Sequence, residues 1–200
     1  MSVKSVDTKL FNKLNIFSYN SRGFGADKQD ILKTLAVTDD KSIPIICNQE
    51  NFLLSNNSYK VKQCLPGSDI YFKKAEMDLV AGRTKNGMFI AVPLAFKEYV
   101  KNESPNHWRI QAVVIRCENS KTLIINSYFP TDPRTNDFDT SDLLSTIDAI
   151  NETLDTVDFD NVVWTGDINA DFGRNSKFTS LVDEFVKDKG LLRARDKYSD

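Results

Sequence analysis

The sequence predicts a layered α/β protein built on mixed β-sheets. Strand-like segments alternate with a few helical patterns, several strands follow one another with no helix between them, and polar residues recur where strands end. Strands without an intervening helix favour antiparallel neighbours, so a purely parallel sheet is not expected. With 200 residues, 40% of them hydrophobic, the chain is long enough for one domain with a real core.

The first half of the chain contains two expected strands and one helix. Residues 13–19 read as a strand ending at Asn20, and residues 43–47 as a buried strand that leads to Gln49-Glu50. Between them, Asp27 is the predicted N-cap of a short helix. The apolar face of this helix is formed by Ile31, Leu32, Leu35 and Ala36.

The middle of the chain reads as three strands followed by a helix. Residues 88–93, 109–117 and 123–128 are rich in β-branched side chains, which favour strands. A helix is expected to begin at Thr140 or Ser141. Its apolar residues, at spacings of three and four, are Leu143, Ile147, Ile150, Leu154 and Val157.

The last expected elements are one strand and one helix. The strand spans residues 161–165 and leads directly to Asp167. The helix is expected to end at Gly190, since glycine readily adopts the left-handed conformation that terminates helices. Its apolar face carries Phe178, Leu181, Val182, Phe185 and Val186.

Charge and cysteine content narrow the class of protein. The formal net charge is -2 and the charges are dispersed, unlike a strongly basic nucleic-acid-binding domain, although a local patch can serve the same purpose. The candidates for such a patch are Lys60, Lys62, Lys73, Lys74, Arg83 and Lys85. Three irregularly spaced cysteines favour buried thiols in a reducing compartment. No apolar run is long enough to cross a bilayer, so we expect a soluble intracellular protein without membrane association.

The segment Gly166-Asp167-Ile168-Asn169 is the strongest candidate for chemistry. Alternate side chains share one face of a strand, so Asp167 and Asn169 are expected to point into one pocket. A carboxylate can orient or deprotonate a water molecule, and an amide can donate to an oxyanion. Taken alone, the same segment also fits an ordinary turn after a strand.

Polar residues stand at the carboxyl ends of four expected strands. They are Asn20, Glu50, Tyr128, Asp167 and Asn169. Because α/β proteins commonly place ligand sites at such rims, we expect these side chains to converge.

Four motifs in one order carry a resemblance to a known family. They are Tyr19-Asn20-Ser21-Arg22-Gly23, Gln49-Glu50, Asn126-Ser127-Tyr128-Phe129-Pro130-Thr131 and Gly166-Asp167-Ile168-Asn169. Over residues 13–192 the chain resembles the endonuclease/exonuclease/phosphatase superfamily. That likeness implies the DNase-I-like fold, a four-layer α/β/β/α sandwich of two mixed sheets, here lacking the last strands. Residues 1–12 would then be an N-terminal extension, and 13–200 a domain incomplete at its C-terminus.

Within the superfamily, the chain is most similar to the apurinic-type endonuclease domain of LINE-type (non-LTR) retrotransposons. The segments behind this likeness are Asn20-Ser21-Arg22-Gly23-Phe24, Gly82-Arg83 before Gly87-Met88-Phe89-Ile90, Tyr128-Phe129-Pro130-Thr131-Asp132, and Trp164 to Phe172 followed by Arg174. The resemblance implies hydrolysis of a DNA phosphodiester to leave a 3′-hydroxyl nick. It also implies DNA as partner, a downstream reverse transcriptase on the same polyprotein, and action in the nucleus.

The resemblance also implies roles for individual residues. Glu50, helped by Asn20, would hold Mg²⁺ or Mn²⁺, which stabilises charge on the phosphate and on the leaving oxygen. Asp167 would orient and activate the attacking water, while Asn169 and Tyr128 would donate hydrogen bonds to phosphate oxygens.

Two positions extend this implied site or depart from the family pattern. Thr131 stands where relatives often have another phosphate-contacting residue. Arg22 replaces a second acid of the apurinic-site repair enzymes, and it becomes a candidate phosphate contact instead.

The largest departure from the family is a missing histidine. Relatives carry a late Ser-Asp-His element, whereas the only histidine of this chain is His107, at the start of a mid-chain strand, where it is expected to pack beside Trp108. The catalytic histidine therefore has no counterpart in the sequence. Two alternatives stay open: a catalytically inactive fragment or binding module of the same fold, and a phosphoesterase acting on lipid or inositol phosphates.

Overall fold

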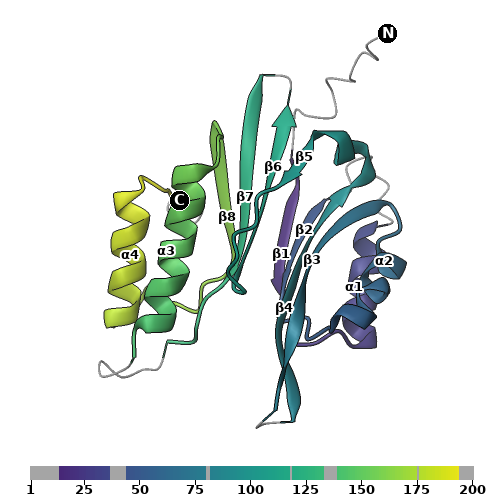
Figure 1. The fold of residues 1–200 in the computed structure, drawn as a ribbon, viewed down its shortest axis with the longest axis horizontal. Coiled ribbons are helices and arrows are strands. Elements are labelled where there is room, and N and C mark those ends of the chain that lie inside the picture. Colours follow the sequence, from purple (N-terminus) through teal and green to yellow (C-terminus); the bar gives the residue numbers. More distant parts are fainter. Residues whose placement is uncertain are drawn as a thin grey trace.

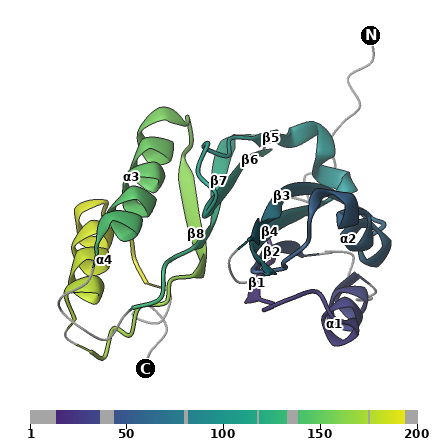
Figure 2. The same ribbon diagram turned by 60° about the horizontal axis from the view of Figure 1, so that its bottom comes forward.

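Two β-sheets face each other and helices cover the outer face of each, as the ribbon views show (Figures 1 and 2). This computed structural model describes residues 14–36, 44–79, 82–117, 119–132, 139–174 and 176–193. The order of layers is helices, sheet, sheet, helices. The predicted four-layer α/β/β/α sandwich of two mixed sheets is confirmed.

Sheet 1 has the strand order β1-β2-β4-β3. Its strands are β1 (Ile16–Asn20), β2 (Ile45–Gln49), β3 (Ser68–Asp78) and β4 (Arg83–Pro93). β1 runs parallel to β2, while β4 is antiparallel to both of its neighbours. The outer face is covered by α1 (Ala26–Ala36) and α2 (Tyr59–Cys64), and a short 3₁₀ helix, η2 (Ser55–Asn57), precedes α2.

Sheet 2 has the strand order β5-β6-β7-β8. Its strands are β5 (Val100–Asn102), β6 (Ile110–Cys117), β7 (Ser120–Tyr128) and β8 (Asn161–Asp167), and the 3₁₀ helix η3 (Leu94–Tyr99) leads into β5. Only the β7–β8 pair is parallel among these strands. Two helices, α3 (Ser141–Thr156) and α4 (Lys177–Asp188), cover the outer face. Of the helices described, none has the length and apolarity needed to cross a membrane.

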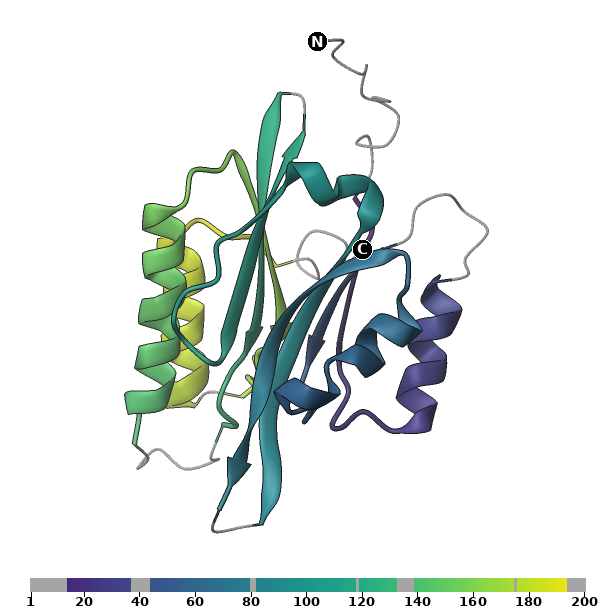
Figure 3. The same cartoon turned by 45° about the vertical axis from the view of Figure 1, so that its right-hand side comes forward.

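The β3–β4 hairpin was missed in part by the sequence prediction. β3 was not expected, β4 begins at Arg83 and not at residue 88, and α2 was also unexpected. The far end of the hairpin projects beyond the rest of the sandwich (Figure 3). Both of its faces meet solvent there, so this part of β3 and β4 needs no alternation of apolar and polar residues.

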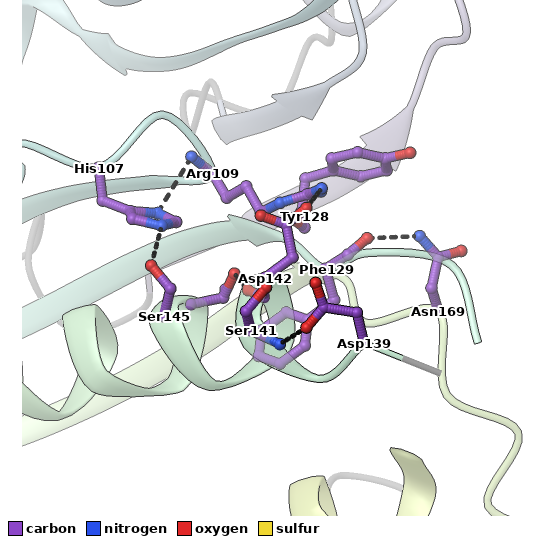
Figure 4. Close-up of polar contacts among 10 residues, drawn as sticks. His107, Arg109, Tyr128, Phe129, Asp139, Ser141, Asp142, Ser145 and Asn169 are labelled. Carbon is purple, nitrogen blue, oxygen red and sulfur yellow. Dashed lines mark hydrogen bonds and ion pairs between the residues drawn. The ribbon is translucent and has the colours of Figure 1, made fainter. Parts of the chain in front are cut away.

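Of the two predicted helix caps, that of α3 is confirmed in position and that of α1 is wrong. α1 begins at Ala26, so Asp27 lies inside the first turn, where a negative charge favours the helix dipole. Thr140 is the N-cap residue of α3, but its side chain makes no cap hydrogen bond. Asp139 supplies this contact, because its Oδ1 accepts from the backbone N–H of Ser141 at 2.8 Å (Figure 4).

The core has three apolar layers. One lies under α1 and α2, one lies under α3 and α4, and the third lies between the sheets. The buried members of the third layer are Ile45, Cys47, Ile90, Val92, Phe96, Val113, Ile115 and Ile124. Cys47 and Cys64 are buried as free thiols, as expected, and Cys117 is partly buried.

We expect Gly166→Ala to destabilise the fold strongly. Gly166 has φ = 134°, and a Cβ atom there would stand 1.9 Å from the carbonyl oxygen of Ser127 on β7. Because relieving this clash requires the backbone of β7 to move, the expected loss in free energy of unfolding is more than about 4 kcal/mol. Urea denaturation measures this loss.

Gly190→Ala is the matched control for this substitution. Gly190 also has a positive φ, 64°, but a Cβ atom there meets nothing within 4 Å. Its cost should be about 1–2 kcal/mol, the strain of a left-handed residue alone. Equal losses in the two variants would contradict the steric argument at Gly166.

Candidate active site

The carboxyl ends of two parallel strand pairs meet at one end of the sandwich. β1 and β2 place Asn20 beside Gln49, which is followed by Glu50, and β7 and β8 place Tyr128 beside Asp167. A cavity of about 820 Å³ opens there. Its lining includes six of the seven predicted site residues, namely Arg22, Glu50, Tyr128, Thr131, Asp167 and Asn169. The seventh, Asn20, is hydrogen-bonded to three of them.

Asn20 connects the two acids of the site. Its Nδ2 donates to Glu50 Oε2 at 2.6 Å and to Asp167 Oδ2 at 2.7 Å, while its Oδ1 accepts from the backbone N–H of Arg22 at 3.0 Å. One amide nitrogen from sheet 1 therefore holds a carboxylate from each sheet. Hydrogen bonds to charged acceptors are the strong ones, and these two offset the repulsion between the carboxylates.

The relation between Asp167 and Asn169 differs from the prediction. β8 ends at Asp167, and Asn169 has φ = 52°, so the alternation of a strand does not bring them together. A turn does, because Asp167 Oδ1 accepts from the backbone N–H of Asn169 at 3.2 Å. Asn169 Nδ2 donates to the carbonyl of Phe129 at 2.8 Å, which fixes the amide beside the cavity (Figure 4). Both residues line the cavity, as predicted, but the alternation of side chains along a strand was the wrong reason for expecting them there.

Glu50 stands on a strained turn directly after β2. Its φ is 52°, and Arg22, after β1, has φ = 46°. The two turns are bonded to each other, since the N–H of Gly23 donates to the carbonyl of Glu50 at 2.7 Å. Left-handed non-glycine residues are costly and cluster at functional sites. Their pairing here supports a built site at the ends of β1 and β2.

Tyr128 remains a phenol over the whole physiological range. Burial raises its pKa to about 12, and the negative charge of Glu50 and a hydrogen bond to Glu50 act in the same direction. A protonated phenol at the cavity wall can donate a hydrogen bond to an anionic ligand.

Arg109 is a site residue that the sequence prediction missed. Its guanidinium lines the cavity 3.8 Å from the ring centroid of Trp108 and 5.3 Å from that of Tyr128. Nη2 pairs with Asp142 at 2.9 Å and Nη1 donates to the carbonyl of Tyr128 at 3.3 Å (Figure 4). Nε is buried without a hydrogen-bond partner in the described part of the chain. The available signal was an arginine at the start of a strand rich in apolar residues.

The six basic residues considered for a DNA-facing patch do not share one surface. Arg83 and Lys85 line the cavity, whereas Lys60 and Lys62 lie on α2, which covers the outer face of sheet 1. Lys73 is half-buried beneath the loop before β6. Lys74, the next residue of β3, is exposed and is not part of the cavity lining, so it is not a candidate for the site.

His107 is not part of the cavity lining. Its ring stacks on that of Trp108, with centroids 6.3 Å apart, and its Nε2 lies 3.2 Å from Ser145 Oγ (Figure 4). The predicted packing pair of His107 with Trp108 is confirmed.

The donors at the site are suited to a hard divalent cation. Within the described ranges, no group of three or more His, Cys, Asp or Glu side chains could hold a metal ion. Glu50 and Asp167 nevertheless bring two carboxylate oxygens within 2.7 Å of one nitrogen atom. Carboxylate oxygens are the ligands that Mg²⁺ and Mn²⁺ prefer, and these ions complete their coordination with water and phosphate.

Solved structures show the same fold. The 3′ phosphatase NExo from Neisseria, bound to a product DNA hairpin, superposes with a TM-score of 0.62 at 16% identity, covering 88% of this chain and 71% of that one. The AP endonuclease LMAP from Leishmania major superposes with a TM-score of 0.56 at 10% sequence identity, covering 87% of this chain and 66% of that one. D. rerio TDP2, complexed with a single-strand DNA product, superposes with a TM-score of 0.53 at 18% sequence identity, covering 92% of this chain and 67% of that one.

Sequence comparisons find no such likeness. No family model matches the chain, and no curated protein matches it. The chain spans about two thirds of the length of LMAP and TDP2 and about half of C. elegans TDP2. The similarity is therefore one of architecture, and the fold is DNase-I-like.

Removing the amide bridge should destabilise the protein. Asn20→Leu keeps the side-chain size but leaves two partly buried carboxylates without their donor, so we expect a loss of about 1–3 kcal/mol in free energy of unfolding. The control is Asn151→Leu, because Asn151 also donates to a carboxylate, that of Asp155, but at the surface of α3. Urea titration that finds equal effects would argue against a structural bridge at Asn20.

Alkaline pH should reveal the buried phenol of Tyr128. Its folded pKa of about 12 lies above the ordinary value of 10.0, so the unfolded chain loses this proton first. The contribution to stability is present below pH 10 and is lost as the pH rises toward 12. Tyr128→Phe should reduce this loss, whereas Tyr59→Phe, at an exposed tyrosine, should not. Unfolding free energies across this range measure the difference, and identical profiles would contradict it.

Proposed function

We propose that this protein is a divalent-metal-dependent DNA endonuclease that hydrolyses a phosphodiester and leaves a nick with a 3′-hydroxyl. The observation that carries the proposal is the Asn20 bridge. It holds Glu50 and Asp167, one from each sheet, at the mouth of a cavity that also contains Tyr128 and Arg109. The two carboxylates, the phenol of Tyr128 and the guanidinium of Arg109 therefore surround the place where a phosphate would lie.

Asp167 is suited to orient the attacking water. Its Oδ1 accepts from Asn169 N–H and its Oδ2 accepts from Asn20, so both oxygens have fixed directions. An oriented carboxylate can accept a proton from water as the oxygen attacks phosphorus. Asn169 keeps one amide N–H beyond its bond to Phe129, and this N–H can donate to a phosphate oxygen.

The other lining residues are suited to bind and stabilise the phosphate. The protonated phenol of Tyr128 can donate to a phosphate oxygen in place of Glu50, and Thr131 adds a hydroxyl at the rim. Arg22 and Arg109 supply positive charge, which stabilises the extra negative charge of the transition state. A Mg²⁺ or Mn²⁺ ion held by Glu50, with help from Asn20 and Asp167, would supply Lewis-acid stabilisation of the phosphate and the leaving oxygen.

The structural neighbours support DNA as the substrate class. NExo is described with a product DNA hairpin, TDP2 with a single-strand DNA product, and LMAP as an AP endonuclease. We favour DNA over lipid or inositol phosphates for this reason. The more specific proposal is that the protein nicks the target site of a retrotransposon in the nucleus and acts with a downstream reverse transcriptase on the same polyprotein. This proposal rests on the segments Asn20–Phe24 and Tyr128–Asp132.

One observation favours the alternative of an inactive DNA-binding module. His107, the only histidine in the sequence, lies outside the cavity lining. Without an imidazole in the cavity, stabilisation of the transition state would depend on Arg22, on Arg109 and on a metal ion held by Glu50. The two proposals differ in whether Asp167 matters for turnover.

A plasmid-nicking assay tests the proposal. Supercoiled plasmid with Mg²⁺ should be nicked by the wild-type protein, and EDTA should abolish the reaction. Asp167→Ala should slow nicking by about 10²–10³-fold, the usual cost of losing one such group. Asp171→Ala is the control, because Asp171 lies in the same segment but is exposed and does not line the cavity.

Each other outcome identifies one alternative. Equal residual nicking by wild type and Asp167→Ala would support the inactive module. Release of phosphate from inositol phosphates, without plasmid nicking, would support the phosphoesterase.

A further inference from the structure

Lys73 makes an unusual set of contacts between the two sheets. It lies on the same face of β3 as Tyr71, which packs in the layer between the sheets. Its Nζ donates to the carbonyls of Pro105 at 3.0 Å, His107 at 2.6 Å and Ile110 at 2.6 Å. Pro105 and His107 belong to the loop that enters β6, and Ile110 is the first residue of β6. The three carbonyls use all three N–H donors of the ammonium group.

Burying the ammonium group of Lys73 without a carboxylate partner costs free energy, which indicates that this side chain does more than fill space. The described residues place no carboxylate within ion-pair distance of Lys73, so only carbonyl dipoles balance its charge. Burial lowers the pKa of Lys73 to about 8. An apolar residue would avoid this penalty if filling space were the only task. It would remove the donor from the carbonyls of Pro105 and Ile110, and it would leave the His107 carbonyl with only the N–H of Ile110, at 3.2 Å.

The loop bound by Lys73 carries two residues of the cavity wall. Trp108 and Arg109 lie between the His107 and Ile110 carbonyls, and both line the cavity. The loop also contacts α3, because His107 Nε2 lies 3.2 Å from Ser145 Oγ (Figure 4). Within the loop, His107 Nδ1 accepts from Arg109 N–H at 3.3 Å.

A second bond reinforces the same junction. Gln111 Nε2 donates to the carbonyl of Tyr71 at 2.7 Å. Lys73 and Tyr71 on β3 therefore bind both sides of the point where β6 begins. The position of the Arg109 guanidinium depends on where this point is held.

We propose that Lys73 is a positioning residue: it fixes the loop of residues 105–110 so that Trp108 and Arg109 stand against Tyr128 in the cavity wall. The consequence for catalysis rests on the proposed function, because it requires that Arg109 binds a phosphate of the substrate. The effect on the loop itself does not depend on that function.

The variants for the test are Lys73→Met and Lys74→Met. Lys74 is the next residue of β3, is exposed and lies outside the cavity lining, so it controls for loss of a charge from the same strand. Lys73→Met should raise the KM for plasmid about tenfold, as expected when a charge-assisted contact is misplaced, with a smaller change in kcat. Lys74→Met should leave both constants close to wild type.

A double-mutant cycle with Arg109→Met shows whether Lys73 acts through Arg109. If it does, adding Lys73→Met to Arg109→Met should change KM by less than twofold, since coupled residues are not additive. Fully additive effects would overturn the inference.

NMR of the single histidine provides a readout without activity. Burial, then the charges of Lys73 and Arg109, lower the pKa of His107, while Asp142 on α3 acts in the opposite direction. Lys73→Met should raise this pKa and remove the ring-current shift that Trp108 imposes on the Arg109 side chain; Lys74→Met should do neither. If no variant nicks DNA but these signals change, the proposed function fails and the positioning role stands. If neither signal responds to Lys73→Met, the positioning role fails.

Discussion

A buried hydrogen bond between the two sheets is the contact on which the candidate site depends. Gln49 Nε2 donates to Asn126 Oδ1 at 2.5 Å, and Asn126 Nδ2 donates to the carbonyl of Asn48 at 3.1 Å. Gln49 is 1% exposed and Asn126 is fully buried. Apolar layers are non-directional and tolerate sliding, whereas buried amides bond in only a few arrangements. Because Gln49 precedes Glu50 and Asn126 lies two residues before Tyr128, this bond places the acid and the phenol opposite each other.

Two further polar contacts connect the sheets closer to the site. Asn20 joins Glu50 and Asp167 across the gap between the sheets, and Lys73 joins β3 to the loop that carries Arg109. Each contact pairs a side chain of sheet 1 with a group of sheet 2 or of its connecting loop. Hydrophobic burial therefore stabilises the sandwich, while a few polar contacts set its register where geometry matters for chemistry.

The charges around the cavity have a consistent arrangement. Glu50 and Asp167 lie together and Arg22 and Arg109 line the same cavity, so the negative and positive groups that a phosphodiester and a divalent cation require are both present. Ring contacts hold the Arg109 guanidinium on Trp108 and Tyr128. Preorganised charges of this kind are worth more than mobile ones, because no reorganisation is needed during reaction. The DNase-I-like architecture supplies the scaffold, and these residues supply the case for a nuclease.

The architecture, most of its helices and strands, and the residues at the strand ends could be predicted from the amino-acid sequence. Apolar periodicity is a local property, so it identified β1, β2, β6, β7, β8 and the helices α1, α3 and α4, and the motifs identified Asn20, Glu50, Tyr128 and Asp167. How these residues meet, and which other residues join them in the site, depends on the packing of the two sheets. Arg109 and Lys73 depend on contacts between segments far apart in the chain, such as the bond from Lys73 to Ile110. Asn169 joins the site through a left-handed turn, not through strand alternation. No local pattern records such contacts, since they exist only once the two sheets have packed.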